Sequence, residues 1–211
     1  MRNIVRVNTR TGEVRIAPCS EDELRWGGRS LIAHLMLREV RPTCDALGRD
    51  NKLIVASGWL GDTVVTTAGR CSVGGKSPLT GGVKEANVGG EPGKQLARLG
   101  VRALVLEDAP EKPEPRVLWV GKDKCKILSA PELRGAEVRE TFDLLRRRFG
   151  EAIAFFCIGP AARTVERMPQ LPCPIRIVTR QRTSSQVRQE PLSRQARPGA
   201  CRYFLVSTAA I

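Results

Sequence analysis

The sequence predicts an α+β fold in which β-sheets carry flanking helices. Short apolar runs rich in β-branched residues and separated by turn residues are typical of strands. Longer segments with apolar side chains three and four positions apart are typical of helices that pack on a core. The 211 residues, 41% of them hydrophobic, suffice for one domain with a real core or for two small ones.

The predicted strands bracket the helices along the whole chain. The first two form a hairpin about the turn from Thr9 to Gly12, and the apolar run from Val101 to Glu107 is predicted to be central. The expected strands are Ile4 to Asn8, Glu13 to Ala17, Lys52 to Ser57, Cys71 to Val73, Val83 to Ala86, Val101 to Glu107, Pro113 to Trp119, Cys125 to Leu128 and Ala152 to Ile158.

Start and stop signals define the helices. Ser20 begins a capping box with Glu23, whose carboxylate and the Ser20 hydroxyl can satisfy free amides at a helix start. The pair Gly27-Gly28 interrupts that helix, and the next one must end before Pro42. The expected helices are a short one after Ser20, Ser30 to about Val40, about Gly93 to Arg98, and about Glu137 to Phe149.

The stretch from Gly69 to Gly90 indicates an anion site. Seven of its 22 residues are glycine, but strand-like runs interrupt them and the Ser, Gln and Pro bias of a flexible linker is missing. Glycine amides can approach an anion closely, and Arg70, Lys76 and Lys84 would supply positive charge. A phosphate or pyrophosphate ligand is the functional interpretation, and hairpin turns with glycine at tight corners are the structural alternative.

The common nucleotide motifs do not fit this stretch. A P-loop needs glycine five residues before the Gly75 that precedes Lys76, and Arg70 stands there. Pro78 would also remove an early amide of the helix that should follow. No G-x-G-x-x-G sequence occurs in the stretch either.

Cysteine, histidine and hydropathy narrow the classes of function. Seven scattered cysteines include no C-x-x-C pair, so buried or free thiols are favoured over a cluster held by this chain alone. His34 lies on the apolar run from Leu31 to Leu37 and is expected to be a packed ring. No apolar run reaches the roughly 20 residues of a membrane span and no signal-like segment opens the chain, so we expect a cytoplasmic protein.

The net charge of +13 is unevenly distributed. Residues 163–211 carry nine Arg and two Glu, whereas residues 1–162 carry 26 basic and 20 acidic side chains. From about Arg163 the apolar pattern also stops. We therefore divide the chain into a domain of residues 1–162 and a basic tail of residues 163–211, disordered or aberrant. The tail lacks the interleaved aromatic residues of a nucleic-acid binder.

Four groups of residues stand in a specific order, namely Asn51 to Gly58, Gly69-Arg70, Lys76 to Gly82 and Ala86 to Gly90. The pairing of Lys-Ser-Pro-Leu-Thr-Gly-Gly with the later Asn-x-Gly-Gly is the most specific feature. In order and spacing these groups resemble the N-terminal domain of the tungsten-containing aldehyde ferredoxin oxidoreductases. The resemblance runs from about residue 4 to about residue 162.

The resemblance implies a saddle of two related β-sheet halves that supports a tungsten or molybdenum bis-pterin cofactor, with the second half incomplete here. Arg70 would contact a pterin phosphate, and Asn87, Gly89 and Gly90 would present backbone groups to the same region. A magnesium ion between the two phosphates would bind near the carbonyl oxygen of Asn87.

The chain departs from the family pattern beside this site. Relatives usually carry proline where Trp59 stands and aromatic residues where Glu91 and Pro92 stand. A carboxylate at position 91 would repel an anion.

The resemblance also implies an activity. In the intact family the metal oxidises an aldehyde to a carboxylate, and electrons pass through a 4Fe-4S cluster to ferredoxin. Later domains supply the cluster cysteines, and this chain lacks those ligands and the second half of the cradle. We therefore expect the isolated chain not to turn over aldehydes. Our hypothesis for the tail after about residue 163 is a truncated or frameshifted copy that has left its ancestral reading frame.

Two other functions stay open at this point. The chain could be a non-catalytic pterin- or phosphate-binding subunit that works beside a separately encoded remainder of the enzyme. A basic nucleic-acid-binding protein is the less favoured alternative, because the charge of the tail lacks a recognisable binding motif.

Overall fold

The computed structural model describes residues 2–110, 114–121, 124–150, 153–157 and the backbone of residues 203–209. The predicted strand ends at Pro113, Ala152 and Ile158 lie outside the described residues, as does most of the tail. The strands are β1 (Asn3–Asn8), β2 (Val14–Pro18), β3 (Lys52–Ser57), β4 (Cys71–Lys76), β5 (Val83–Val88), β6 (Val101–Glu107), β7 (Pro115–Val120), β8 (Cys125–Ser129), β9 (Ile153–Phe156) and β10 (Tyr203–Ala209). The helices are α1 (Glu21–Leu24), α2 (Arg29–Glu39), α3 (Glu91–Arg98), the short 3-10 helix η1 (Pro131–Leu133) and α4 (Val138–Phe149).

The strands form two sheets. The first has the order β2-β1-β6-β3-β4-β5, and the second has the order β8-β7-β10-β9. Most neighbours are antiparallel, but β1 runs parallel to β6 and β10 runs parallel to β9. The α+β fold with flanking helices is thus confirmed, and β6 lies between β1 and β3 as the prediction of a central strand requires.

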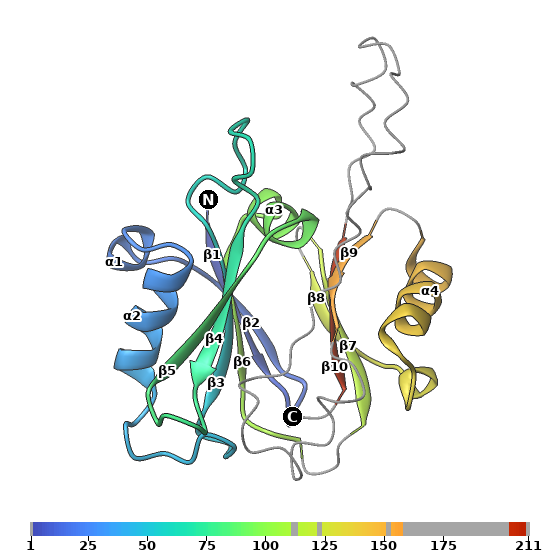
Figure 1. The fold of residues 1–211 in the computed structure, drawn as a ribbon, viewed down its shortest axis with the longest axis horizontal. Coiled ribbons are helices and arrows are strands. Elements are labelled where there is room, and N and C mark those ends of the chain that lie inside the picture. Colours follow the sequence, from blue (N-terminus) through green and yellow to red (C-terminus); the bar gives the residue numbers. More distant parts are fainter. Residues whose placement is uncertain (1, 111–113, 122–123, 151–152, 158–202, 210–211) are drawn as a thin grey trace.

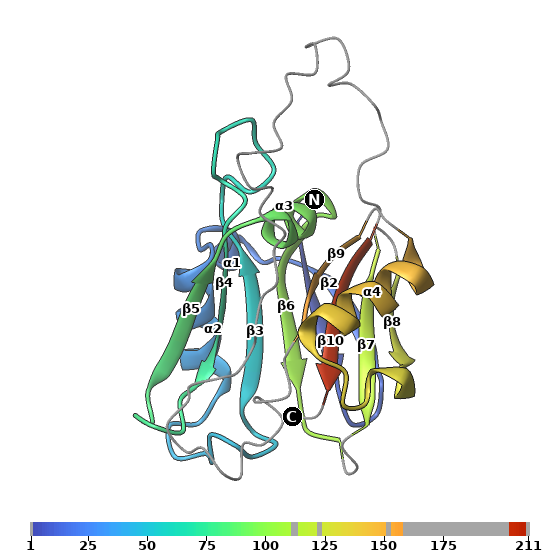
Figure 2. The ribbon, with the colours of Figure 1, turned by 45° about the vertical axis from the view of Figure 1, so that its right-hand side comes forward.

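The sheets stand side by side, with α2 on the outer face of the first and α4 on the outer face of the second (Figures 1 and 2). Strand β3 shows how alternation produces these layers. Its Ile54 and Ala56 belong to the cluster under α2, whereas Val55 belongs to the cluster between the sheets. A third cluster lies under α4 and includes Leu145 and Phe155.

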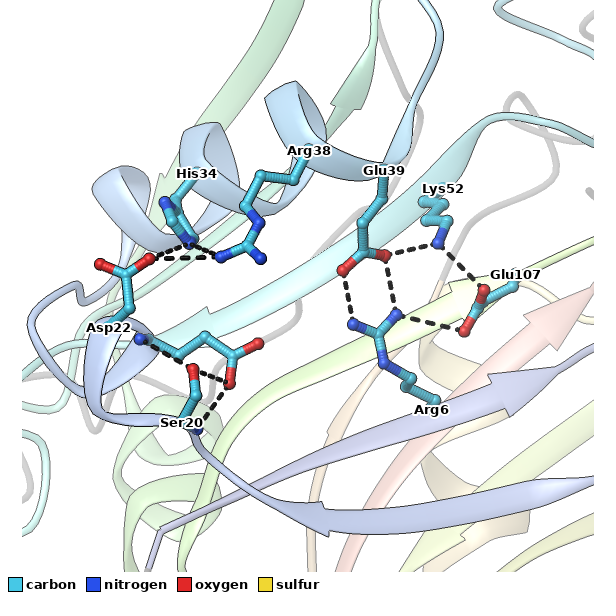
Figure 3. Close-up of polar contacts among 9 residues, drawn as sticks. Arg6, Ser20, Asp22, His34, Arg38, Glu39, Lys52 and Glu107 are labelled. Atoms are coloured by element: carbon cyan, nitrogen blue, oxygen red, sulfur yellow. Dashed lines mark hydrogen bonds and ion pairs between the residues drawn. The ribbon is translucent and has the colours of Figure 1, made fainter.

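The capping box predicted for the first helix is formed. Ser20 Oγ accepts a hydrogen bond from the Glu23 amide at 3.3 Å, and the Glu23 carboxylate accepts one from the Ser20 amide at 2.8 Å (Figure 3). The helix is only one turn long, and Gly28, with φ of 54°, precedes α2. The pair Gly27-Gly28 therefore separates two helices, as predicted.

Four charged side chains join the end of α2 to the first sheet (Figure 3). Glu39 of α2 pairs with Arg6 of β1 at 2.5 Å and with Lys52 of β3 at 2.5 Å. Glu107 of β6 pairs with the same two cations at 3.4 and 3.1 Å. All four side chains are between 15 and 30% exposed, so water screens them only in part.

The structure differs from the predicted elements in several places: η1 was not predicted, α3 begins at Glu91, and β5 continues to Val88. Two further differences concern β4 and β10. Strand β4 continues to Lys76, which is paired with Val83 of β5. A Cβ at Gly74 would meet Lys84 O at 2.6 Å and Ile32 Cγ2 at 3.0 Å, so glycine at this position lets β5 and α2 lie close to the strand. Strand β10 was not predicted, although its seven residues lie within the region assigned to the tail. The polar composition of the surrounding tail gave no signal for a strand. The strand is formed by pairing with β7 and β9, and β7 is far away in the sequence.

Among the described residues, no helix combines the length and the apolar character that a membrane crossing requires.

Candidate anion-binding site at the end of β4 and β5

The hairpin of β4 and β5 brings the predicted site residues together. Cys71 is opposite Val88 and Ser72 is opposite Asn87, so the residue before β4 and the residues after β5 meet at one end. There the Nε of Arg70 donates a hydrogen bond to Oδ1 of Asn87. Gly89 lies alongside, since a Cβ built on it would be 3.4 Å from Nη1 of Arg70.

Helix α3 begins against the same place. Gly90 caps its N-terminus with φ of 103°, which favours glycine. A Cβ at Gly93 would be 2.5 Å from Gly69 O, so the first turn of α3 packs directly on the backbone that carries Arg70. Arg70, Asn87, Gly89 and Gly90 therefore form one cluster, which we call the Arg70 site.

The side chain of Asn87 orients the guanidinium. Its Oδ1 accepts from Arg70, while its Nδ2 lies 3.5 Å from the hydroxyl of Ser72. Arg70 is exposed, and no carboxylate of the described residues lies at ion-pair distance from it. Its remaining N–H groups are thus available to an anion, which can accept two of them at once.

Two of the three predicted cations, Lys76 and Lys84, do not lie at the Arg70 site. Lys76 and Lys84 belong to the opposite end of the hairpin, because β4 runs from Cys71 to Lys76 and Gly75 is paired with Lys84. The ammonium of Lys76 donates to the carbonyl oxygens of Pro42 and, at 2.6 Å, of Cys44. The prediction that these lysines surround the same anion as Arg70 is therefore wrong, and Lys76 instead anchors the loop after α2.

A buried cation on β6 was missed. Arg102 of β6 is only 4% exposed, and its Nε and Nη2 donate to Trp26 O at 3.1 and 2.9 Å. The ring of Trp59 lies over the guanidinium, with its centroid 5.0 Å from Cζ. A charged residue within the apolar run from Val101 to Glu107 was the available signal, because such a residue is buried only with specific partners.

A carboxylate also lies beside the Arg70 site. Glu91 occupies the first turn of α3, and its Oε2 accepts a hydrogen bond of 2.9 Å from Nε2 of Gln95. This contact holds the carboxylate along the helix and uses one of its acceptor positions. Negative charge at a helix N-terminus is also stabilised by the helix dipole.

Comparison with known proteins identifies the family. Residues 4–171 match the N-terminal domain of aldehyde ferredoxin oxidoreductase. The chain belongs to this family. The tungsten-containing aldehyde ferredoxin oxidoreductases of Pyrococcus furiosus and Thermococcus kodakarensis are each 37% identical to it over 164 residues. The alignment covers 76% of this chain and 27% of each relative, so the chain spans about a quarter of their length.

A solved structure shares the fold. The active-site complex BamBC of benzoyl coenzyme A reductase, determined with 1,5-dienoyl-CoA, superimposes with a TM-score of 0.71 and is 26% identical. The match covers 76% of this chain and 25% of that one. The aldehyde ferredoxin oxidoreductase N-terminal fold is therefore present here in a chain much shorter than its relatives.

Two of the five described cysteines carry thiols that burial keeps protonated. Burial raises the pKa of Cys71 and of Cys125 to about 12, so both thiols stay protonated at neutral pH. Within the described ranges, no three His, Cys, Asp or Glu side chains gather as a metal site. His34 stacks on Trp26 with ring centroids 5.8 Å apart, in agreement with the predicted packed ring.

Proposed function

We propose that this chain binds the phosphate end of a tungsten- or molybdenum-pterin cofactor at the Arg70 site. The observation that carries the proposal is the bond from Arg70 to Asn87 beside Gly89. It presents an exposed guanidinium without a carboxylate partner among the described residues, next to backbone that carries no side chain. Such a surface fits a doubly charged phosphate group.

The residues present fit only part of such a group. Arg70 would hold a phosphate by its free N–H groups, and Gly89 and Gly90 would let the backbone approach it. The carbonyl oxygen of Asn87 would be one ligand of a magnesium ion, whose other ligands would be phosphate oxygens and water. The bound metal-pterin would supply the two-electron oxidation of an aldehyde to a carboxylate.

We further propose that catalysis needs polypeptide beyond this chain. The chain spans about a quarter of its relatives, and its described cysteines form no cluster site. A separately encoded remainder would supply the 4Fe-4S ligands, the second half of the cradle and the contact with ferredoxin. This chain alone would orient the cofactor phosphate without turning over aldehyde.

Metal and pterin analysis of the purified chain tests the cofactor proposal. Cells grown with tungstate or molybdate should yield protein that contains metal and releases a pterin on denaturation. Arg70→Gln should lose both, whereas Lys84→Gln removes one exposed charge at the far end of the hairpin and should lose neither. Equal metal and pterin in Arg70→Gln and in the original chain would contradict the proposal.

The tail hypothesis has its own test. The family match continues to residue 171, and residues 203–209 pair with two strands of the second sheet. A frameshift near residue 163 would require that another frame of the coding DNA encode the glycine-rich continuation of the family. If neither alternative frame encodes it, the hypothesis fails.

A further inference from the structure

The segment between β3 and β4 rises beyond the end of the first sheet, beside α3 (Figures 1 and 2). It begins at Gly58 and ends at Arg70, and these two residues meet, because the Gly58 amide donates a hydrogen bond of 3.2 Å to Arg70 O. A Cβ at Gly58 would lie 3.2 Å from the same oxygen. The backbone position of Arg70 therefore depends in part on where Gly58 is held.

The residues on either side of Gly58 are both fixed to β6. The hydroxyl of Ser57, a residue that is only 1% exposed, donates to this strand, with Val101 O at 3.1 Å and Arg102 O at 3.3 Å. On the other side, the ring of Trp59 lies over the guanidinium of Arg102, with its centroid 5.0 Å from Cζ. Arg102 thus contacts the residue before Gly58 through its backbone and the residue after it through its side chain.

The guanidinium of Arg102 is itself held in place. Its Nε and Nη2 donate to Trp26 O at 3.1 and 2.9 Å, and the ring of Trp26 stacks on His34 of α2. A Cβ at Gly27 would be 2.1 Å from Cδ1 of Trp59, so glycine is needed here for the indole to lie on the backbone. The guanidinium therefore offers the Trp59 ring a fixed cationic surface.

Packing alone does not account for a charge at this position of β6. The neighbours of Arg102 from Val101 to Leu106 are apolar and buried, and a buried guanidinium carries a desolvation cost that another apolar side chain would not. What the guanidinium adds is direction, since it donates hydrogen bonds to one neighbour and attracts the aromatic ring of another. Trp59 is 58% exposed, so burial does little to hold its ring.

We propose that Arg102 is a positioning residue for the Arg70 site and acts through Trp59 and Gly58. The inference rests on the proposed phosphate-binding function of that site. Arg102 holds the Trp59 ring, the ring keeps the start of the segment against β6, and the Gly58 amide then fixes the carbonyl oxygen of Arg70. The guanidinium of Arg70 consequently meets a phosphate group in one arrangement, so less conformational entropy is lost when the anion binds.

Amide hydrogen exchange of Gly58 in the full chain tests the positioning without any ligand. Trp59→Ala should speed this exchange about two- to fivefold at fixed pH, the factor expected for loss of a contact between a cation and a ring. Trp59→Phe keeps an aromatic ring and should retain the original rate. Gly27→Ala should act like Trp59→Ala, because its Cβ takes the place of the indole. Val64→Ala is the matched control, since Val64 lies in the same segment and is fully exposed, and it should change nothing.

The affinity for inorganic pyrophosphate, titrated by isothermal calorimetry at fixed ionic strength, tests the consequence for the site. Trp59→Ala and Gly27→Ala should each weaken binding about two- to fivefold, whereas Trp59→Phe should retain the original affinity. Arg102→Gln should weaken binding at least as much as Trp59→Ala. If Arg102→Gln fails to fold by circular dichroism, the variants of Trp59 and Gly27 decide.

The proposal is overturned by Gly58 exchange that is unchanged in Trp59→Ala, by exchange in Trp59→Phe that is as fast as in Trp59→Ala, or by an equal rise in Val64→Ala. Pyrophosphate binding that Arg70→Gln abolishes but Trp59→Ala leaves unchanged would also overturn it. Failure of the proposed function looks different, because pyrophosphate would then bind neither chain or would bind Arg70→Gln and the original chain equally. The exchange rates would in that case still decide whether Arg102 and Trp59 fix the backbone of Arg70.

Discussion

The carboxylate of Glu39 accepts hydrogen bonds from both terminal nitrogens of Arg6, with Nη1 at 2.8 Å from Oε2 and Nη2 at 2.5 Å from Oε1 (Figure 3). This two-pronged contact joins the last residue of α2 to β1. Lys52 donates to the same carboxylate at 2.5 Å. The end of α2 is therefore fixed to the sheet by charge, whereas the middle of the helix is fixed by the apolar cluster that includes Leu31 and Ile32.

Glu39→Gln should destabilise the fold. The amide keeps the shape of the side chain but leaves Arg6 and Lys52 with one carboxylate, Glu107, between them. We expect a loss of about 1 to 3 kcal/mol in the free energy of unfolding, measured by urea denaturation. Glu13→Gln is the matched control, since Glu13 pairs with exposed Arg15 and with no other cation of the described residues, and it should change little. Equal effects of the two substitutions would refute this role.

Glu39 should also make the free energy of unfolding depend on pH in the acid range. Burial raises its pKa, but the hydrogen bonds and charges of Arg6 and Lys52 outweigh burial and lower the pKa to about 2 from an ordinary 4.5. The group therefore contributes stability that is fully present above pH 4.5 and is lost as pH falls towards 2. After discounting for solvent screening, we expect about 1 to 2 kcal/mol. Denaturation curves from pH 6 to pH 2 should show a shallower loss in Glu39→Gln than in the original chain.

Gly93→Ala should displace the backbone that carries Arg70 and should destabilise the fold. Alanine favours a helix over glycine by up to about 1 kcal/mol. Its Cβ, however, would lie 2.5 Å from Gly69 O and 3.0 Å from the carbonyl carbon of Arg70, which are backbone atoms that cannot turn away. We expect the clash to outweigh the gain in helix propensity and to lower the free energy of unfolding by about 1 to 3 kcal/mol. The measurement is the midpoint of thermal unfolding, which should fall. Gly82→Ala is the control, because its nearest contact would be Thr80 Oγ1 at an ordinary 3.8 Å.

Asn87→Asp should block anion binding without disturbing the fold. The substitution keeps the shape that accepts from Arg70 Nε but places a carboxylate against the guanidinium. Pyrophosphate should then bind the Arg70 site at least about tenfold more weakly, since the new ion pair neutralises its cation. The titration is done on the full chain at fixed ionic strength. Unchanged affinity would mean that Arg70 is not the ligand.

The sequence predicted local features better than distant relationships. The capping box at Ser20 and the hairpin that joins Arg70 to Asn87 are set by residues close in the chain, and both are formed. The separation of Lys76 from Arg70 follows from the pairing of β4 with β5 as far as Lys76, through Gly74 and Gly75, which carry no sequence signal for a strand. Similarly, the partners of Arg102 come from residues 26 and 59, which no local pattern links to β6.

The last prediction concerns β10, the strand that was not predicted from the sequence. β10 lies between β7 and β9, with Leu205 opposite Trp119 and also opposite Phe155. Deleting residues 203–211 would leave β9 without a neighbouring strand in its sheet and expose the edge of β7. We expect a lower thermal midpoint and a red shift in tryptophan fluorescence, whereas deleting only residues 210–211 should change neither. If both deletions unfold like the full chain, β10 does not contribute to the stability of the second sheet.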